Sequence, residues 1–157
     1  MAKDPFTILI VDDDPNDVLL FKRAFHENKI PNPLRILSDG AEAIACLEKA
    51  AEQRAGENNP YPGLIILDLK MPRKTGLDVL MWLKDHPECY VIPTIIFTSS
   101  SQLIDIKLSY GHGANSFIVK PSALAELKAV VKTIYDYWNL CEKLVPEKTE
   151  ATPSTRR

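Results

Sequence analysis

The sequence predicts an α/β fold in which five parallel strands form one sheet with helices packed on both faces, the doubly wound arrangement. Two features of the 157-residue chain predict it. Short apolar runs recur along the chain, several of them rich in β-branched residues, and segments with helical periodicity lie between them. Continuous apolar runs are typical of strands covered on both faces. Alternation of such strands with helices favours right-handed crossovers in a parallel sheet.

Five apolar runs are the expected strands, and residues that favour turns or helix starts bound each of them. Residues 8–11 and 95–97 are continuously apolar, as expected of strands near the middle of a sheet. The five expected strands are residues 7–11, 34–37, 64–67, 94–97 and 116–119.

Five helices are expected between and after these strands. Asp14 and Pro15 supply an N-cap and a proline at the first helical position. Asp39 and Thr75 each precede an acidic residue by three positions, which resembles a capping box and indicates two more helix starts. The last two helices are expected over residues 103–110, which end at a glycine signal, and after Ser122.

Length and charge restrict the class of protein. The length fits about one domain with a real core. Lys and Arg total 19 against 21 Asp and Glu, a net charge of −2, which argues against binding to nucleic acid through a basic surface. No signal peptide and no apolar run of about 18 residues is present, so we expect no membrane segment and a cytoplasmic location.

The ends of the chain and one internal stretch look irregular. We expect one domain over residues 4–145, a polar and disordered tail over residues 146–157, and a long surface loop over residues 52–63. The three cysteines, Cys46, Cys89 and Cys141, are scattered, which favours free thiols in a reducing compartment.

Polar side chains follow four of the five expected strands. Asp12, Asp13 and Asp14 follow the first, Asp68 the third, Thr98 ends the fourth, and Lys120 follows the fifth. In a doubly wound sheet the site lies outside the carboxyl ends of the strands, so we expect these side chains to converge. Crowded carboxylates need a cation, and hard oxygen ligands suit Mg²⁺. A lysine and a hydroxyl beside them suit a phosphoryl group, and a carboxylate can also be a nucleophile.

Each of these residues also has an ordinary structural interpretation. Asp14 is better explained as an acid at a helix N-terminus, and Asp12 and Asp13 could share that role. Asp68 could be a turn residue, Lys120 a solvated surface residue and Thr98 a helix cap. An aromatic residue in a strand, such as Phe117, is usually part of the core. Tyr137 and Trp138 could belong to the core or to an exposed interaction surface.

Taken together and in this order, the motifs resemble the receiver domain of two-component response regulators, over about residues 7–144. The resemblance implies a flavodoxin-like sheet of order 2-1-3-4-5. The matching pieces are Ile-Leu-Ile-Val-Asp12-Asp13-Asp14-Pro15, Leu-Ile-Ile-Leu-Asp68-Leu-Lys-Met71-Pro72, Gly76, Phe97-Thr98-Ser99 and Phe117-Ile-Val-Lys120-Pro121.

The resemblance also implies a role for each site residue. Asp68 would be the phosphoacceptor, and it would bind Mg²⁺ together with Asp12, Asp13 and the backbone carbonyl of Lys70. Thr98 and Lys120 would bind the phosphoryl group. Phe117 would be the aromatic switch residue coupled to Thr98, and the Lys120–Pro121 peptide bond is expected to be cis. Lys70 is a departure, because smaller or neutral side chains are common there, and we expect it to alter the phosphoryl lifetime.

The resemblance narrows further to stand-alone, CheY-like members, because the residues after the expected last helix are too few for an output domain. The loop before residue 64, the Leu-Asp-Leu-Lys-Met-Pro-Arg-Lys segment and the aromatic last helix resemble small regulators paired with bacterial phytochrome kinases. The expected partners are a histidine kinase, such as a phytochrome, or a phosphotransfer protein. A homodimer is also expected, through an interface with the candidates Tyr135, Tyr137, Trp138 and Leu144.

Three functions remain as alternatives. The first is a phosphorylated signalling module that assists its own phosphorylation and dephosphorylation but turns over no external substrate. The second is a small phosphatase with Asp12 and Asp14 as its aspartate pair, although Asn16 breaks the expected motif. The third is a receiver-like interaction module that works without phosphorylation.

Overall fold

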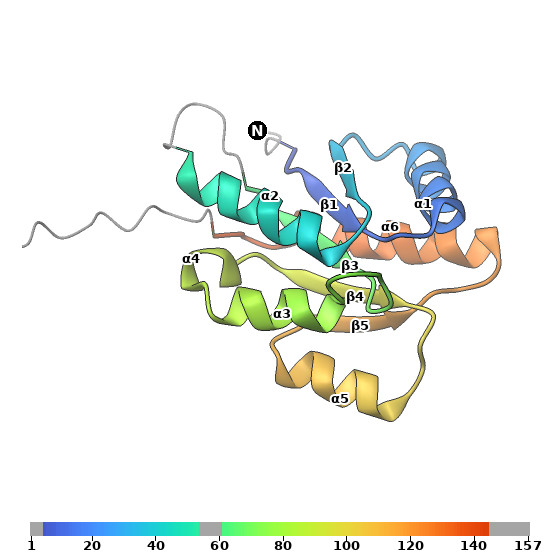
Figure 1. Ribbon diagram of the computed structural model, residues 1–157. Helices are drawn as coiled ribbons and strands as arrows, with labels where there is room; N and C mark the ends of the chain where they lie inside the picture. The colour runs from blue at the N-terminus through green and yellow to red at the C-terminus, as the bar shows by residue number, and fades with distance from the viewer. Residues whose placement is uncertain (1–4, 54–60, 145–157) are drawn as a thin grey trace, which may run out of the picture.

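A single parallel sheet organises the molecule (Figure 1). The computed structural model describes residues 5–53 and 61–144. Its five strands lie in the order β2-β1-β3-β4-β5, and every pairing is parallel, which confirms the predicted order. The carboxyl ends of the strands therefore lie at one edge of the sheet. The strands are β1 (Ile8–Val11), β2 (Leu34–Leu37), β3 (Leu64–Leu67), β4 (Thr94–Thr98) and β5 (Ser116–Val119).

The described residues form six helices, where the sequence predicted five. The additional helix is α4, a single turn whose first residue is Pro87. Four residues are too few to show a helical period, which is why the sequence did not predict it. The helices are α1 (Pro15–Glu27), α2 (Gly40–Glu52), α3 (Gly76–Lys84), α4 (Pro87–Tyr90), α5 (Leu103–Gly111) and α6 (Leu124–Leu140).

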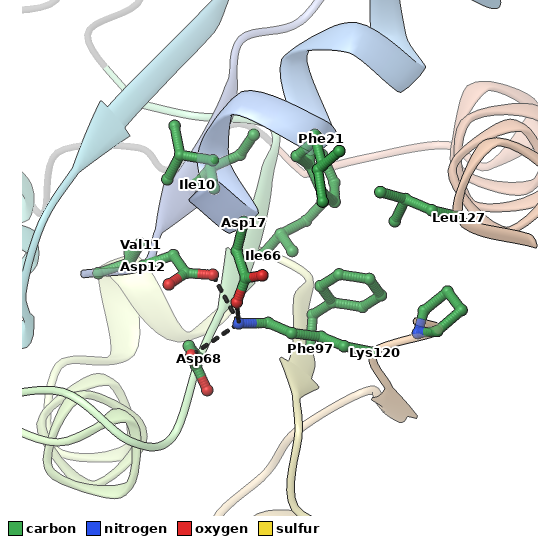
Figure 2. Close-up of a pocket in the computed structure, with 13 residues that line it drawn as sticks. Ile10, Val11, Asp12, Asp17, Phe21, Ile66, Asp68, Phe97, Lys120 and Leu127 are labelled. Atoms are coloured by element: carbon green, nitrogen blue, oxygen red, sulfur yellow. Dashed lines mark hydrogen bonds and ion pairs between the residues drawn. The ribbon is translucent and has the colours of Figure 1, made fainter. Parts of the chain in front are cut away.

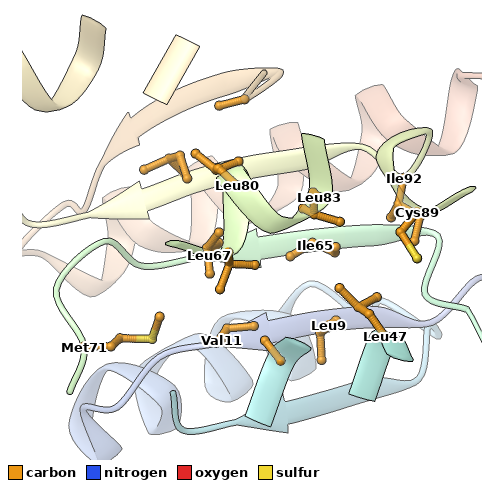
Figure 3. Close-up of a cluster of buried hydrophobic side chains, with 14 of the residues drawn as sticks. Leu9, Val11, Leu47, Ile65, Leu67, Met71, Leu80, Leu83, Cys89 and Ile92 are labelled. Carbon is orange, nitrogen blue, oxygen red and sulfur yellow. The ribbon is translucent and has the colours of Figure 1, made fainter. Parts of the chain in front are cut away.

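Two apolar clusters cover the two faces of the sheet. Successive side chains of a strand point to opposite faces, so Leu9 and Val11 of β1 lie in one cluster and Ile8 and Ile10 in the other. The first cluster is closed by α2, α3 and α4 (Figure 3). The second is closed by α1 and α6, which pack against each other. With both faces covered, the strands can be continuously apolar.

Hydrogen bonds at the helix starts match two of the three predicted caps fully. Asp14 accepts from the backbone N–H of Asn16 at 2.8 Å, and Thr75 forms a reciprocal capping box with Asp78. Asp39 caps α2 by accepting from the Glu42 N–H at 2.9 Å. The Glu42 carboxylate, however, accepts from Ser38 instead of returning to Asp39. That box is therefore only half formed.

Some expectations fall on parts of the chain that the structure does not describe. Residues 54–60 of the expected loop, the tail over residues 146–157, and both limits of the expected domain, residues 4 and 145, lie outside the described residues. At the end of the expected surface loop, Tyr61 is buried in the first cluster instead of lying on the surface, because its ring adds apolar area to the core. Within residues 5–53 and 61–144, no helix is long and apolar enough to cross a membrane.

Candidate functional site

The carboxyl edge of the sheet brings the ammonium of Lys120 among three carboxylates (Figure 2). Its Nζ donates to Asp12 at 2.7 Å, to Asp17 at 2.8 Å and to Asp68 at 2.9 Å. Asp12 follows β1, Asp68 follows β3, and Lys120 follows β5. The predicted convergence of Asp12, Asp68 and Lys120 is confirmed. An ammonium has three N–H donors, so all three are used.

The cluster is mostly out of water. The side chains of Lys120, Asp12 and Asp68 are 9%, 8% and 7% exposed. Apolar side chains, among them Phe21 and Phe97, form the wall of a small cavity beside them. Low local polarity strengthens ion pairs and makes an unpaired charge costly. The arrangement therefore holds Lys120 as a buried counter-ion to the acids.

Burial and ion pairing shift the pKa values of Asp12 and Lys120 in opposite directions. Burial raises the pKa of Asp12 above its ordinary value, and the hydrogen bond from Lys120 opposes that rise. For Lys120, burial alone would lower the pKa, but its bonds to Asp12, Asp17 and Asp68 raise the pKa above the ordinary value of a lysine. Lys120 is therefore a permanent positive charge in this cluster.

Three of the acids could hold a metal ion together. Oxygens of Asp12, Asp13 and Asp68 lie within 4.8 Å of one another. Asp13 is exposed whereas the other two are buried, so the group opens to solvent on one side. Hard carboxylate oxygens with room for water suit a divalent cation such as Mg²⁺. The residues therefore fit the predicted metal. The backbone carbonyl of Lys70 stays a predicted ligand; the Lys70 N–H donates to Asp68 at 3.3 Å.

The predicted phosphoryl-binding and switch residues lie within or just after β4 and β5. Thr98 is fully buried at the end of β4, and its hydroxyl accepts from the Ser100 N–H at 3.4 Å. Phe117 is partly buried against the first apolar cluster, and its backbone N–H donates to the hydroxyl of Tyr110 at 3.1 Å. Pro121 lines the cavity beside Lys120.

The Lys120–Pro121 peptide bond is trans, so the predicted cis bond is wrong. The two isomers of a bond before proline differ by only about 0.5–1 kcal/mol, so local sequence cannot decide between them.

Asp17 is the site residue that the sequence interpretation missed. It lies in the first turn of α1, where an acid is already explained by the partial positive charge of the helix N-terminus. Its contact with Lys120 depends on how α1 sits against the strand ends, which no local pattern in the sequence encodes.

The loop between β3 and α3, which carries Asp68, makes contacts with several neighbouring elements. Gly76 is buried, and a Cβ there would lie 2.2 Å from the carbonyl oxygen of Asp68, so only glycine fits. Arg73 has a positive φ of 63° and donates to Asp39, the cap of α2, with its Nε at 2.8 Å. Lys70 reaches Asp105 of α5 at 3.8 Å. The loop is thus tied to both α2 and α5.

The candidate interface residues lie on and after α6. Tyr137 and Leu144 are 59% and 72% exposed, whereas Tyr135 is partly buried. Trp138 is partly buried against the second apolar cluster. Tyr137 and Trp138 also line a hollow of about 350 Å³ between β5 and α6. Trp138 therefore serves the core in part, and Tyr137 is a surface residue.

Comparison with known proteins gives relatives over nearly the whole chain. Response regulator Rcp1 of Synechocystis sp. is 35% identical over 137 residues, which cover 87% of this chain and 91% of Rcp1. The probable methanogenesis regulatory protein FilR2 of Methanothrix harundinacea is 31% identical, over 87% of this chain and 86% of FilR2.

Solved structures agree with these relatives. The Mn²⁺-bound form of Rcp1 matches with a TM-score of 0.76 and 34% identity, covering 89% of this chain and 99% of that one. The phosphorylated cyanobacterial phytochrome response regulator RcpA matches with a TM-score of 0.75 and 33% identity, over 85% and 94% of the two chains. The response regulator receiver domain family matches residues 8–132. With this match, and with Asp12, Asp13, Asp68 and Lys120 gathered at the strand ends, the chain belongs to the receiver domains of response regulators.

Proposed function

We propose that Asp68 accepts a phosphoryl group from a histidine kinase or a phosphotransfer protein and that the phosphorylated protein signals by contact with other proteins. The observation that carries the proposal is the contact of Lys120 with Asp68 at 2.9 Å, beside two further acids that can share a metal ion. A carboxylate held next to a fixed positive charge and a cation site is suited to receive a phosphoryl group.

In the proposed transfer, a carboxylate oxygen of Asp68 attacks phosphorus while the bond from phosphorus to the donor imidazole nitrogen breaks. A P–O bond replaces the P–N bond, and the leaving imidazole takes up a proton from solvent. Lys120 holds the acceptor oriented and then donates to a phosphoryl oxygen in place of the carboxylate. Positioning and charge neutralisation supply most of the rate in such transfers.

The proposal also includes a divalent metal ion bound beside Asp68. Asp12, Asp13, Asp68 and the carbonyl of Lys70 would hold Mg²⁺, which offsets the negative charge of acceptor and phosphoryl group when it is bound. The Mn²⁺-bound structure of Rcp1, a relative at 34% identity, supports the choice of a divalent ion.

Thr98 and Phe117 would carry the change away from the site. The Thr98 hydroxyl, which accepts from the Ser100 N–H, would donate its own proton to a phosphoryl oxygen. Phe117 is two residues before the end of β5 and partly buried, and it would change its packing when Thr98 moves. A group of about −1.5 to −2 charge on Asp68 is strong enough to reorganise such neighbours.

Membership of the receiver family implies a kinase or phosphotransfer partner. We infer that the kinase is a bacterial phytochrome, because RcpA is described as a phytochrome response regulator and is 33% identical over most of its length. We also infer one receiver domain over residues 4–145, since this chain aligns with 91% of Rcp1. Turnover of an external substrate is not part of the proposal, and the cytoplasmic location stays a prediction.

A homodimer is the second part of the proposal. Tyr137, which lines the hollow against the edge strand β5, and Leu144, after α6, both present exposed apolar area that a second copy could cover. Sizing with and without beryllofluoride tests this. Tyr137→Ala and Leu144→Ser should each shift the protein toward the monomer, whereas Arg23→Gln on the exposed side of α1 should not.

Labelling with acetyl phosphate tests the acceptor. We expect a Mg²⁺-dependent gain of one phosphoryl group in the wild type and none in Asp68→Asn, read by mass spectrometry. Asp14→Asn is the matched control, because asparagine keeps the cap of α1. Labelling that survives in Asp68→Asn and is lost in Asp12→Asn would favour the phosphatase alternative. No labelling in any variant would favour the phosphorylation-independent module.

A further inference from the structure

The third partner of Lys120 is Asp17, which the proposed transfer does not use. Asp17 belongs to α1, whereas Asp12 and Asp68 follow strands. Its Oδ2 lies 2.8 Å from Nζ of Lys120, as close as the two strand-end acids. Its side chain is 34% exposed, so its charge is less costly to hold there than that of Asp12 or Asp68.

Phosphorylation of Asp68 would change the three contacts of Lys120 in different ways. Asp68 becomes an acyl phosphate, and its contact with Lys120 passes to the phosphoryl oxygens. Asp12 would face the metal with one of its two oxygens. Asp17 alone has no other partner among the contacts that the structure gives for it, so it keeps its share of the Lys120 charge. One of the three N–H donors of Lys120 would therefore keep its bond to Asp17 of α1.

We propose that Asp17 is a positioning residue that sets the charge balance of the acceptor site through Lys120, favouring the bound cation and opposing the bound phosphoryl group. The inference rests on the proposed function of Asp68. Asp17 contacts the ammonium of Lys120 and adds a fourth carboxylate to the site, beside the metal-binding group of Asp12, Asp13 and Asp68. Extra negative charge attracts Mg²⁺ and repels an added anion, while the bond to Lys120 draws positive charge from the acceptor.

Opposite effects on two ligands separate this role from a purely structural one. Asp17→Asn keeps the size and one acceptor oxygen but removes the charge. We expect the dissociation constant for Mg²⁺ to rise about threefold and the half-saturating concentration of beryllofluoride at saturating Mg²⁺ to fall about threefold, as fits a partly exposed ion pair. A variant that only lost structure would bind both Mg²⁺ and beryllofluoride more weakly.

Asp14→Asn is the matched control for charge. Asp14 lies in the same turn, is exposed, and caps α1 without a contact to Lys120 among the bonds of the described residues. It should shift both constants by clearly less than Asp17→Asn. Equal shifts in the two variants would mean that Asp17 acts as a general surface charge, and would overturn the role of Lys120 in the proposal.

Calorimetric titration with MgCl₂ and then with beryllofluoride gives both constants, and thermal unfolding checks that each variant is folded. Wild-type protein that takes up no beryllofluoride contradicts the proposed function itself. Wild-type uptake together with unchanged constants in Asp17→Asn, or with shifts of the same sign, overturns the Asp17 inference alone. Asp17→Ala repeats the test without an acceptor oxygen and should lose Mg²⁺ affinity at least as strongly.

Discussion

Two helices of equal length, α3 and α5, are anchored very differently. Each has nine residues and is the next long helix after a site residue at a strand end, Asp68 after β3 for α3 and Thr98 of β4 for α5. Helix α3 begins with a full capping box and buries four residues, whereas α5 has no side-chain cap bond and buries only Ser109. Leu103 and Ile104 of α5 are 63% and 57% exposed. Helix α3, after Asp68, is therefore firmly anchored, and α5, after Thr98, is loosely anchored.

Position in the sheet explains the contrast. Helix α3 packs beside α2 over the middle of the sheet, whereas α5 lies beside the edge strand β5 (Figure 1). Among the described residues, the Ser109 hydroxyl is the one buried side-chain polar atom without a hydrogen-bond partner, which costs about 1–3 kcal/mol. Loose anchoring near Thr98 and Phe117 is what a helix needs if it is to shift when the site changes.

The largest expected difference between α3 and α5 is the loss of stability when one leucine in each helix is truncated. Leu80 of α3 is 1% exposed, so Leu80→Ala should lower the free energy of unfolding by about 2–5 kcal/mol. Leu103→Ala on the exposed face of α5 should change it by less than about 0.5 kcal/mol. Urea denaturation measures both. Similar losses in the two variants would mean that α5 is as well packed as α3 in solution.

Thiol reactivity probes how tightly the α3 side is closed. Cys89 of α4 packs in the cluster below α3, and burial raises the pKa of Cys89 to about 11. Since the thiolate is the reactive form, Cys89 should react with iodoacetamide at pH 8 at least about 100-fold more slowly than an ordinary thiol. Cys141, which is only partly buried, is the internal reference. Peptide mass spectrometry over time gives both rates, and comparable rates would point to frequent opening of this side.

Removal of the unpaired hydroxyl should strengthen α5. Ser109→Ala deletes the buried polar atom and installs the best helix former, so the free energy of unfolding should rise by about 1 kcal/mol. Val79→Ala in the buried face of α3 is the matched small truncation, and it should lower stability. A drop in stability for Ser109→Ala would show that the hydroxyl has a partner in solution.

The ion pair between Arg73 and Asp39 contributes to the anchoring of α3 in a pH-dependent way. The cap bond from Glu42 and the bonds from Arg73 lower the pKa of Asp39 below its ordinary value. The charged form is thus favoured in the folded protein, so the stabilisation is complete above the ordinary pKa of an aspartate and is lost as the pH falls through the lowered value.

Asp39→Asn keeps a good cap but loses the pair. The wild type should therefore be more stable than Asp39→Asn at pH 7, and the difference should shrink toward zero as the pH falls through the lowered pKa of Asp39. Urea denaturation across this range follows it. Because the Arg73 side chain is largely exposed, this is the smallest of the four effects. A difference that is independent of pH would assign the loss to the cap.

The sequence predicted what depends on local pattern. The strands are short and continuously apolar, and the caps at Asp14 and Thr75 are formed by neighbours two or three residues away. The meeting of Asp12, Asp68 and Lys120 followed from the strand order, which places their carboxyl ends together.

The contacts that the sequence did not predict join residues distant along the chain. Arg73 and Asp39 are 34 positions apart, and Asp17 and Lys120 are 103 apart. Their pairing depends on how α1, α2 and the β3–α3 loop sit on the sheet, which no local pattern encodes. In the same way, only packing decides that Tyr61 is buried.

The close approach of Gly76 to Asp68 has a mechanical consequence. Because the first residue of α3 touches the carbonyl of Asp68 with no space for even a methyl group, α3 and Asp68 have little room to move relative to each other. We expect strain created at Asp68 to be relieved on the other side of the loop, where Lys70 contacts Asp105 of the loosely anchored α5 through a largely exposed ion pair. The absence of a side chain at Gly76 thus influences which side of the β3–α3 loop can move.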